Sequence, residues 1–310
     1  MEQIDRDRLK AELEKIVGVS VRVDVSAKDL TTLAIGGPLS IVVSVETLSA
    51  LISTIELVRR HHMPLFFLGK GSNLLIADAG FPGAVIRLDG EFRSVDFSVT
   101  TEDGVQEVTA GGGASLMNLS RESADRGLLG LGFAGGIPAS LGGAVRMNAG
   151  AHGGEMADVI SWVEGISDGV LKRHQPNEID FKYRRCSLPS DCLVTRVGLV
   201  LRQGESEEAR RIRAECLEER RARQPLTVPS AGSIFKNPSP TLSAGRLIEE
   251  AGCKGMTSGD VEISSMHANW IVNPRKIGRA SDVMALIERV QERVLRVHGV
   301  ALETEIVRLG

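Results

Sequence analysis

The sequence predicts a mixed α and β fold made of two or three subdomains. The length of 310 residues exceeds a minimal domain. Apolar strand-like runs and helical apolar periodicities share the chain, as expected of α/β material. A glycine-rich run over 130–155, with almost no charge, is the third observation and indicates a ligand-binding loop region.

Composition narrows the class of protein. Hydrophobic residues make up 42% and charged residues 25% of the chain, which is ordinary for a globular protein. The net charge of −3 argues against a nucleic-acid surface. Residues 1–10 are charged and lack a signal-peptide core, and no stretch approaches a membrane span. We therefore expect a cytoplasmic protein with no membrane or nucleic-acid partner.

The cysteines show no metal-ligand spacing and indicate a reduced protein with no metal site. They are Cys186, Cys192, Cys216 and Cys253.

Helical spacing of apolar residues predicts a helix over 49–60, with Ser49 as its N-cap. Short strands are expected at 63–68, 74–76 and 84–88. The turn 69–73 follows the first of these strands, where open sheets often bind ligands.

The middle of the chain predicts a strand at 105–110 and a helix from Ser115 to Gly127, a suitable C′ residue. Two further strands are expected at 159–165 and 193–201.

The C-terminal third begins with a Glu- and Arg-rich helix over 205–223, which we expect to open a new domain. Helices at 247–251 and 281–298 follow, each ended by glycine. A last strand is expected over 300–309, and its period of two puts Glu303 and Glu305 on one face. These acids indicate either an exposed edge or a carboxylate presented into a cleft.

The glycine-rich run predicts close approach of main chain to a ligand, with N–H groups directed at an anion. Its length suggests a large, flat, phosphorylated cofactor. The turn 69–73 is not a Walker A loop, and no Rossmann fingerprint follows the first strand. Taken with the run, anion binding at this turn is the better interpretation.

Three further polar segments allow both structural and functional interpretations. Residues 230–238 are either a turn or a reactive segment, and 181–185 either a basic strand end or a binding element. Residues 267–270 are a packed polar corner, since no second histidine lies at ligand spacing.

Together these segments resemble one known family, the UDP-N-acetylenolpyruvoylglucosamine reductases. The resemblance is carried, in the family's order, by Thr31–Pro38, Leu68–Leu75, Gly135–Pro138, Met147–Gly150, Tyr183-Arg184, Pro229–Pro238, His267–Asn269 and Leu302–Glu305. It implies an α+β chain with an FAD-binding fold of the vanillyl-alcohol oxidase type, built from two α/β subdomains, and a C-terminal α/β substrate domain. The implied domains are 1–90, 91–203 and 204–310. The absence of tyrosine between Leu201 and Ser233 is similar to the shorter type of the family.

The resemblance implies that this chain is an NADPH-dependent flavoenzyme. Its reaction would be the reduction of UDP-N-acetylglucosamine enolpyruvate to UDP-N-acetylmuramate for peptidoglycan synthesis. NADPH reduces non-covalently bound FAD, and flavin N5 then delivers hydride to the substrate. Ser233 matches the family's proton donor. Arg184 and a protonated Glu305 stabilise the charge that develops on the substrate.

The implied binding residues fall into two groups. Cofactor contacts are expected from Gly69, Lys70, Gly71, Ser72, Asn73, Gly135, Gly136, Ile137, Pro138, Gly142, Gly143, Ala144, Asn148, Gly150 and Gly153. Substrate contacts are expected from Tyr183, Arg223, Lys236 and Asn237. Two departures from the family stand out: His152 replaces a tyrosine and Gly132 a glutamate.

Two other functions stay open. One is a sugar or alcohol oxidase of the same fold, although the segment around Ser233 has no use in that reaction. The other is a non-catalytic regulator that binds flavin or a UDP-sugar. In each case the expected partner is a small molecule, with no obligate protein partner.

Overall fold

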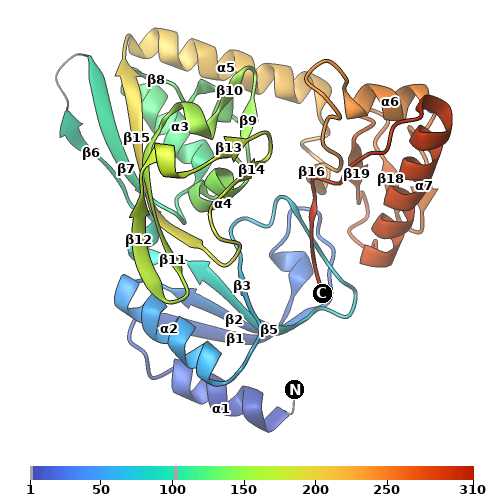
Figure 1. Ribbon diagram of the computed structural model, residues 1–310. Coiled ribbons are helices and arrows are strands. Elements are labelled where there is room, and N and C mark those ends of the chain that lie inside the picture. Colours follow the sequence, from blue (N-terminus) through green and yellow to red (C-terminus); the bar gives the residue numbers. More distant parts are fainter. Residues whose placement is uncertain (1–2, 101–103) are drawn as a thin grey trace. The chain divides into compact units, whose positions relative to one another are not determined.

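The computed structural model describes residues 3–100 and 104–310, and it has mixed helix and strand content (Figure 1). The α-helices are α1 Gln3–Leu13, α2 Leu48–Arg60, α3 Leu116–Asp125, α4 Leu141–Arg146, α5 Ser206–Arg223, α6 Ala244–Glu250 and α7 Ala280–His298. The longer strands are β1 Val19–Ser26, β2 Pro38–Val45, β5 Phe81–Leu88, β6 Val95–Thr100, β7 Val105–Gly111, β11 Ile160–Ser167, β12 Val170–His174 and β15 Leu193–Gln203. The shorter strands are β3 Leu65–Phe67, β4 Leu74–Ile76, β8 Leu128–Leu129, β9 Gly150–Ala151, β10 Gly154–Glu155, β13 Phe181–Lys182, β14 Arg185–Cys186, β16 Ser230–Ser233, β17 Thr257–Ser258, β18 Val261–Ile263, β19 Trp270–Val272 and β20 Val307–Leu309.

The chain divides into two compact units whose segments interleave along the sequence. The first unit comprises Met1–Arg22, Ile41–Gly69 and Gly83–Glu219. The second comprises Val23–Ser40, Lys70–Pro82 and Arg220–Gly310. The consecutive domains 1–90, 91–203 and 204–310 are a different partition and stay a prediction.

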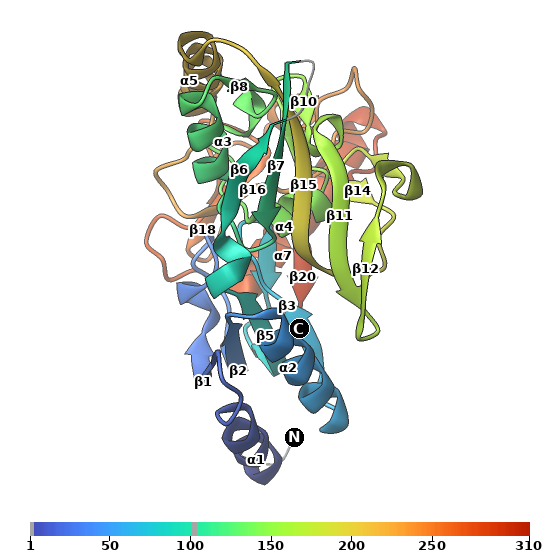
Figure 2. The same cartoon turned by 90° about the vertical axis from the view of Figure 1, so that its left-hand side faces the viewer.

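The first unit is built around an antiparallel sheet of order β12-β11-β15-β7-β6, with β8 also paired to β15. Figure 2 shows β7, β15 and β11 side by side. The expected strands at 105–110, 159–165 and 193–201 are confirmed. Val197 and Leu199 of β15 are fully buried in the core of this unit, because alternate residues of a strand point to the same face of the sheet.

Helix ends follow the expected capping chemistry in most places. Gly127 follows α3 with φ of +73°, and Gly299 follows α7 with φ of +67°, the left-handed conformation that favours glycine. The expected cap at Ser49 is wrong. Thr47 caps α2 instead, because its side chain accepts the N–H of Ala50.

The second unit contains a sheet of order β16-β19-β18-β17. The long helix α7 runs beside this sheet (Figure 1) and buries one apolar stripe against it. That stripe comprises Val283, Leu286, Ile287, Val290 and Val294.

The expected strand over 300–309 is wrong in most of its length. Only β20, Val307–Leu309, is a strand, and it pairs in parallel with β4. Residues 303–305 pair instead with 234–236, through Lys236 N to Glu303 O (2.9 Å) and Glu305 N to Ile234 O (2.7 Å). The segment is extended as its alternation predicts, but it changes partner at Ile306.

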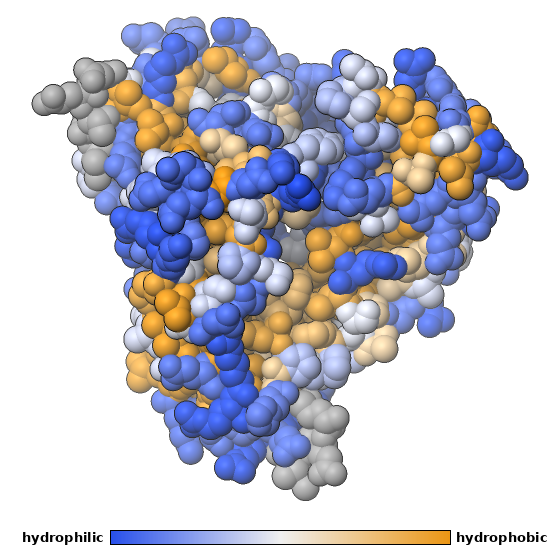
Figure 3. Space-filling model, viewed as in Figure 1, coloured by the Kyte–Doolittle hydropathy of each residue, from blue (hydrophilic) through white to orange (hydrophobic). Residues whose placement is uncertain are grey.

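Hydrophilic side chains cover much of the face in Figure 3, with hydrophobic ones interspersed. Apolar atoms contribute a large share of the surface of any globular protein, so exposed apolar side chains are normal here. In the described part of the chain, none of the helices combines the length and apolar character needed to cross a membrane.

Candidate active site

The loop Lys70–Asn73 in the second unit offers a set of uncommitted main-chain donors. Among the described residues, none accepts a hydrogen bond from the N–H groups of Lys70, Gly71, Ser72 or Asn73. Gly71 has φ of +63°, and a Cβ there would collide with Leu30 O. Consecutive N–H groups without protein acceptors form a concavity suited to a phosphate. This loop therefore fits an anionic group of the cofactor.

The glycine-rich run in the first unit is used more for packing than expected. A Cβ at Gly135 would stand 3.1 Å from Arg213 Cγ on α5, and one at Gly142 would stand 3.2 Å from Val194 O. The N–H groups of both glycines already donate to main-chain carbonyls. These positions need glycine because other parts of the protein lie against them.

A few positions in the same run stay open. Gly136, with φ of +87°, and Ser140 have N–H groups that no described residue accepts. Gly143 is exposed, and a Cβ at Gly153 would meet no atom within 4 Å. Gly136 and Ser140 are themselves buried, whereas Gly143 and Gly153 are accessible to a ligand.

The remaining expected cofactor residues differ in accessibility. Gly69 and Pro138 are exposed, Ile137 and Gly150 are half-buried, and Ala144 is buried. Their contact with a cofactor stays a prediction.

Tyr183 and Arg184 form the turn between β13 and β14. Arg184 has φ of +59°, and its Nη2 donates to Gly150 O at 3.1 Å. Its guanidinium carbon lies 4.9 Å from the centre of the Tyr183 ring, and Tyr183 is exposed. A guanidinium fixed in this way can bind a carboxylate through two parallel hydrogen bonds.

Asn148 also contacts the hairpin formed by β13 and β14. It is fully buried, its Nδ2 donates to Lys182 O (3.3 Å), and its Oδ1 accepts the N–H of Ala157 (3.0 Å). Its side chain is therefore engaged by the protein, and its N–H donates to Val145 O at 3.0 Å, so a contact of Asn148 with the flavin stays a prediction.

Ser233 ends β16, where it lies opposite Trp270 of β19. The next residues are fixed by Asn269, whose Oδ1 accepts Phe235 N (2.9 Å) and whose Nδ2 donates to Phe235 O (2.8 Å). Asn269 O also accepts Ile234 N at 2.9 Å. The sequence marked Asn269 only as part of a motif, and its position just before a buried strand was the available signal.

Glu305 is brought next to this segment within the second unit. Its N–H donates to Ile234 O, the residue after Ser233, and its carbonyl accepts Asn73 Nδ2 at 3.1 Å. The main chain of Glu305 therefore lies beside the residue that follows Ser233.

The expected substrate residues of the second unit are mostly accessible. Lys236 forms an ion pair with the exposed Glu303. Asn237 is exposed, and its Oδ1 accepts Ala244 N at the start of α6 (3.0 Å). Arg223, the last residue of α5, is exposed.

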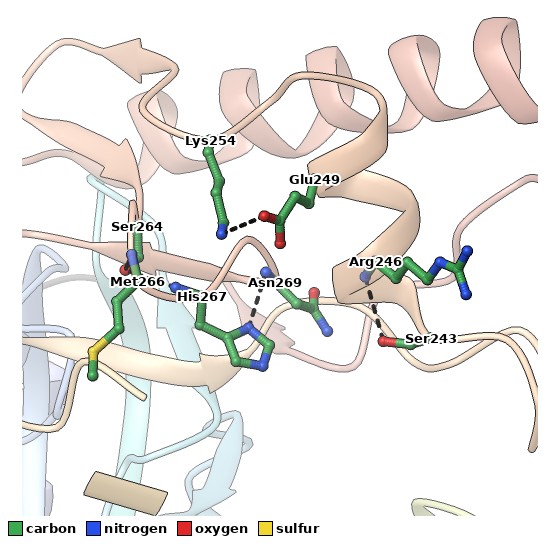
Figure 4. Close-up of polar contacts among 8 residues, drawn as sticks. All are labelled: Ser243, Arg246, Glu249, Lys254, Ser264, Met266, His267 and Asn269. Carbon is green, nitrogen blue, oxygen red and sulfur yellow. Dashed lines mark hydrogen bonds and ion pairs between the residues drawn. The ribbon is translucent and has the colours of Figure 1, made fainter. Parts of the chain in front are cut away.

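His267 lies in the polar corner that the sequence predicted (Figure 4). Its Nδ1 accepts Asn269 N at 3.2 Å, and Ser264 Oγ accepts the N–H of His267 at 3.3 Å. Burial lowers the pKa of His267, and the charge of Lys254 lowers it further. In the described residues, no group of three or more His, Cys, Asp or Glu side chains is arranged to bind a metal.

The two positions expected to depart from the family, Gly132 and His152, both lie beside α5. A Cβ at Gly132 would stand 2.8 Å from Ile212 Cγ2, so a larger side chain there requires Ile212 to shift. His152, with φ of +52°, places its Nδ1 3.0 Å from Glu219 Oε2.

The structure thus groups Ser233, Glu305, Lys236, Asn237 and the loop 70–73 in the second unit. It groups Tyr183, Arg184, Asn148 and the glycine-rich run in the first.

Comparison with known proteins identifies the two halves of the chain. Residues 39–169 match the family model described as FAD binding domain. Residues 224–309 match that of the UDP-N-acetylenolpyruvoylglucosamine reductase C-terminal domain. These matches confirm the expected cofactor, FAD, and the expected fold of an FAD-binding part followed by a C-terminal substrate domain.

Whole-length relatives agree with these matches. The UDP-N-acetylenolpyruvoylglucosamine reductase of Heliobacterium modesticaldum is 45% identical over 284 residues, covering 90% of this chain and 88% of that protein. That of Thermus thermophilus is 45% identical over 267 residues, covering 86% and 93%. The crystal structure of the Thermus caldophilus reductase superposes with a TM-score of 0.81 at 43% identity, over 94% of this chain and 99% of that one. The chain is an FAD-containing oxidoreductase and belongs to the UDP-N-acetylenolpyruvoylglucosamine reductase family.

Proposed function

We propose that this chain reduces UDP-N-acetylglucosamine enolpyruvate to UDP-N-acetylmuramate, with NADPH as the electron donor. The product is a precursor of peptidoglycan, and the reaction takes place in the cytoplasm without an obligate protein partner. The observation that carries the proposal is the contact between Glu305 N and Ile234 O (2.7 Å), since it supports joint action of Ser233 and Glu305.

FAD, when bound, supplies a hydride for the methylene carbon of the enol ether. The protein's task is to stabilise the negative charge that then spreads into the substrate carboxylate. Arg184 carries a permanent positive charge and binds that carboxylate. Glu305, in its protonated form, donates a hydrogen bond to the developing enolate.

Ser233 gives its hydroxyl proton to the carbon adjacent to the one that receives the hydride, and it regains a proton from solvent. A serine hydroxyl is a weak acid, so this transfer requires a strongly basic carbanion and close placement. The fixation of Phe235 by Asn269 supports such placement, because it restrains the backbone two residues from Ser233.

One group of residues binds the substrate and another binds the cofactor. Tyr183, Arg223, Lys236 and Asn237 contact the UDP portion of the substrate. The N–H groups of the loop 70–73 and of Gly136 bind the cofactor's phosphates, a role that their lack of protein acceptors supports.

An anaerobic two-step experiment tests the proposal. The purified flavoprotein is reduced with NADPH, UDP-N-acetylglucosamine enolpyruvate is added, and flavin absorbance is followed. Bleaching followed by prompt recovery is the expected result. Bleaching without recovery on adding the substrate, but with recovery in air, would instead support an oxidase. Failure of NADPH to bleach the bound flavin would support a non-catalytic module.

A further inference from the structure

Asn73 contacts the segment that carries Glu305 through both its side chain and its main chain. Its Nδ2 donates to Glu305 O at 3.1 Å, and its carbonyl accepts Val307 N at 3.0 Å. The second contact begins the parallel pairing of β4 with β20. Asn73 therefore fixes the backbone on both sides of Ile306.

Glu305 is held from the other side by Ile234. The distance from Glu305 N to Ile234 O is 2.7 Å, and Ile306 N lies 3.5 Å from the same oxygen. Residues 303–306 belong to no regular strand. An extended segment of this kind takes its direction from its hydrogen-bond partners, so Asn73 and Ile234 together fix where the Glu305 side chain begins.

The side chain of Asn73 thus has a partner in the protein, whereas its N–H group has none among the described residues. The N–H is the group that an anion at the loop 70–73 would use. The side-chain amide of Asn73 is therefore suited to holding the protein, and its main-chain N–H to binding an anion.

We propose that Asn73 is a positioning residue, whose side-chain amide orients the backbone of Glu305 for the reduction of the substrate. This inference rests on the proposed function, in which the Glu305 carboxyl takes part in the chemistry. It concerns the side chain alone, and the main-chain N–H of Asn73 stays the group expected to contact the cofactor. The loop 70–73 would then have two functions. Its N–H groups would bind an anion, and the side chain of Asn73 would orient Glu305.

The test measures the two half-reactions of the holoenzyme separately in Asn73→Ala. We expect FAD content and the rate of flavin reduction by NADPH to stay within about twofold of wild type. Reoxidation by UDP-N-acetylglucosamine enolpyruvate should slow about 10- to 100-fold, since small displacements of a reacting group carry such penalties. The steady-state loss should fall on kcat more than on KM.

A double-mutant cycle distinguishes positioning from a general structural effect. If Asn73 acts through Glu305, adding Asn73→Ala to Glu305→Gln should slow reoxidation by no more than about twofold further. If the slowing of reoxidation in the double variant equals the product of the two single effects, the inference is overturned. Loss of FAD, or equal slowing of both half-reactions, in Asn73→Ala would also overturn it.

Ser239→Ala is the control in the same unit. The Ser239 hydroxyl lies 3.3 Å from that of Thr241, and Ser239 has no part in the proposed site. Its removal should change neither FAD content nor the rate of either half-reaction. If wild type itself is not reoxidised by the substrate, the proposed function fails; if only the variant pattern is absent, the role of Asn73 fails.

Discussion

The guanidinium of Arg184 donates a hydrogen bond to the carbonyl of Gly150, with 3.1 Å between Nη2 and O. Asn148, which is buried and lies two residues before Gly150, donates a hydrogen bond to the carbonyl of Lys182 in the β13–β14 hairpin that carries Arg184. The short segment 148–150 therefore anchors both the base of the hairpin and the side chain at its tip. Arg184 is aimed by the protein before any substrate arrives.

Asn148→Ala should destabilise this anchor. The variant leaves Lys182 O and Ala157 N without their buried partner, which costs about 1–3 kcal/mol of unfolding free energy. Urea denaturation followed by circular dichroism measures the loss, and KM for the substrate should rise because Arg184 is less well fixed. Unchanged stability combined with loss of FAD would show instead that the amide contacts the flavin.

Ser233→Ala should separate the half-reactions. Flavin reduction by NADPH is expected to proceed at the wild-type rate, whereas reoxidation by substrate slows by about 10²- to 10⁴-fold, the usual contribution of a general acid. Stopped-flow absorbance measures both. Ser239→Ala, whose hydroxyl lies 3.3 Å from that of Thr241, is the control and should leave both rates unchanged. Equal slowing of the two steps in Ser233→Ala would remove the proton-donor role.

Glu305→Gln and Glu303→Gln should behave differently. The first is expected to slow reoxidation by orders of magnitude, as Ser233→Ala does. The second removes an ion pair to Lys236 whose carboxylate is 74% exposed, and such pairs contribute about 0–1 kcal/mol. Its effect should be limited to a change in KM of less than about fivefold. If the two variants exchanged these effects, the acid would be Glu303.

Asp78→Ala should loosen the start of α7. The carboxylate of Asp78 accepts the N–H groups of Ala280 (2.7 Å) and Ser281 (3.1 Å), the first two residues of that helix. Loss of such a cap costs about 0.5–2 kcal/mol of unfolding free energy at neutral pH.

The same carboxyl also predicts a pH dependence. Burial alone would raise the pKa of Asp78, but hydrogen bonds from Ser281 and Ala280 outweigh it and lower the pKa. Its stabilising contribution is therefore present above the ordinary pKa and is lost as the pH falls through the lowered value. Urea midpoints of wild type and Asp78→Ala should converge in acid, and a constant difference would contradict the assignment.

His267→Gln should flatten the acid side of the stability profile. Because burial lowers the pKa of His267 in the folded state, the unfolded chain binds a proton first as the pH falls below about 6.5. Wild type therefore loses stability between that pH and the lower folded pKa, and the variant lacks this loss. Urea titrations at pH 7 and pH 5 measure it, and identical pH slopes would show that His267 protonates freely in the fold.

Elements whose stability comes from their own apolar pattern could be predicted from the sequence. The helix α7 carries a stripe and an ending glycine, and its predicted range, 281–298, differs from the structure by one residue. The helix α1 was not predicted, since its charged residues give it little apolar periodicity. The segment 300–309 alternates like one strand, but a strand requires a neighbour, and the neighbours of this segment lie far away in sequence.

The candidate site shows the same limit. The sequence indicated Ser233, Arg184 and Glu305 through motifs, but the supports of these residues are long-range contacts. Nothing local predicts that Asn73 reaches Glu305, 232 positions later. The glycines of 130–155 were interpreted as ligand contacts, yet Gly132 and Gly135 lie against α5, which follows the run by some distance in sequence.

The parallel pairing of β4 with β20 also bears on how the protein is made. Parallel strands so distant in sequence pair late in folding, because the entropy cost of closing the long loop between them must be overcome first. During synthesis, the loop 70–73 and β4 emerge long before Val307, so they lack their partner strand until β20 has been made. Flavin should therefore be acquired only after translation of β20, and nascent chains truncated before Val307 should bind none.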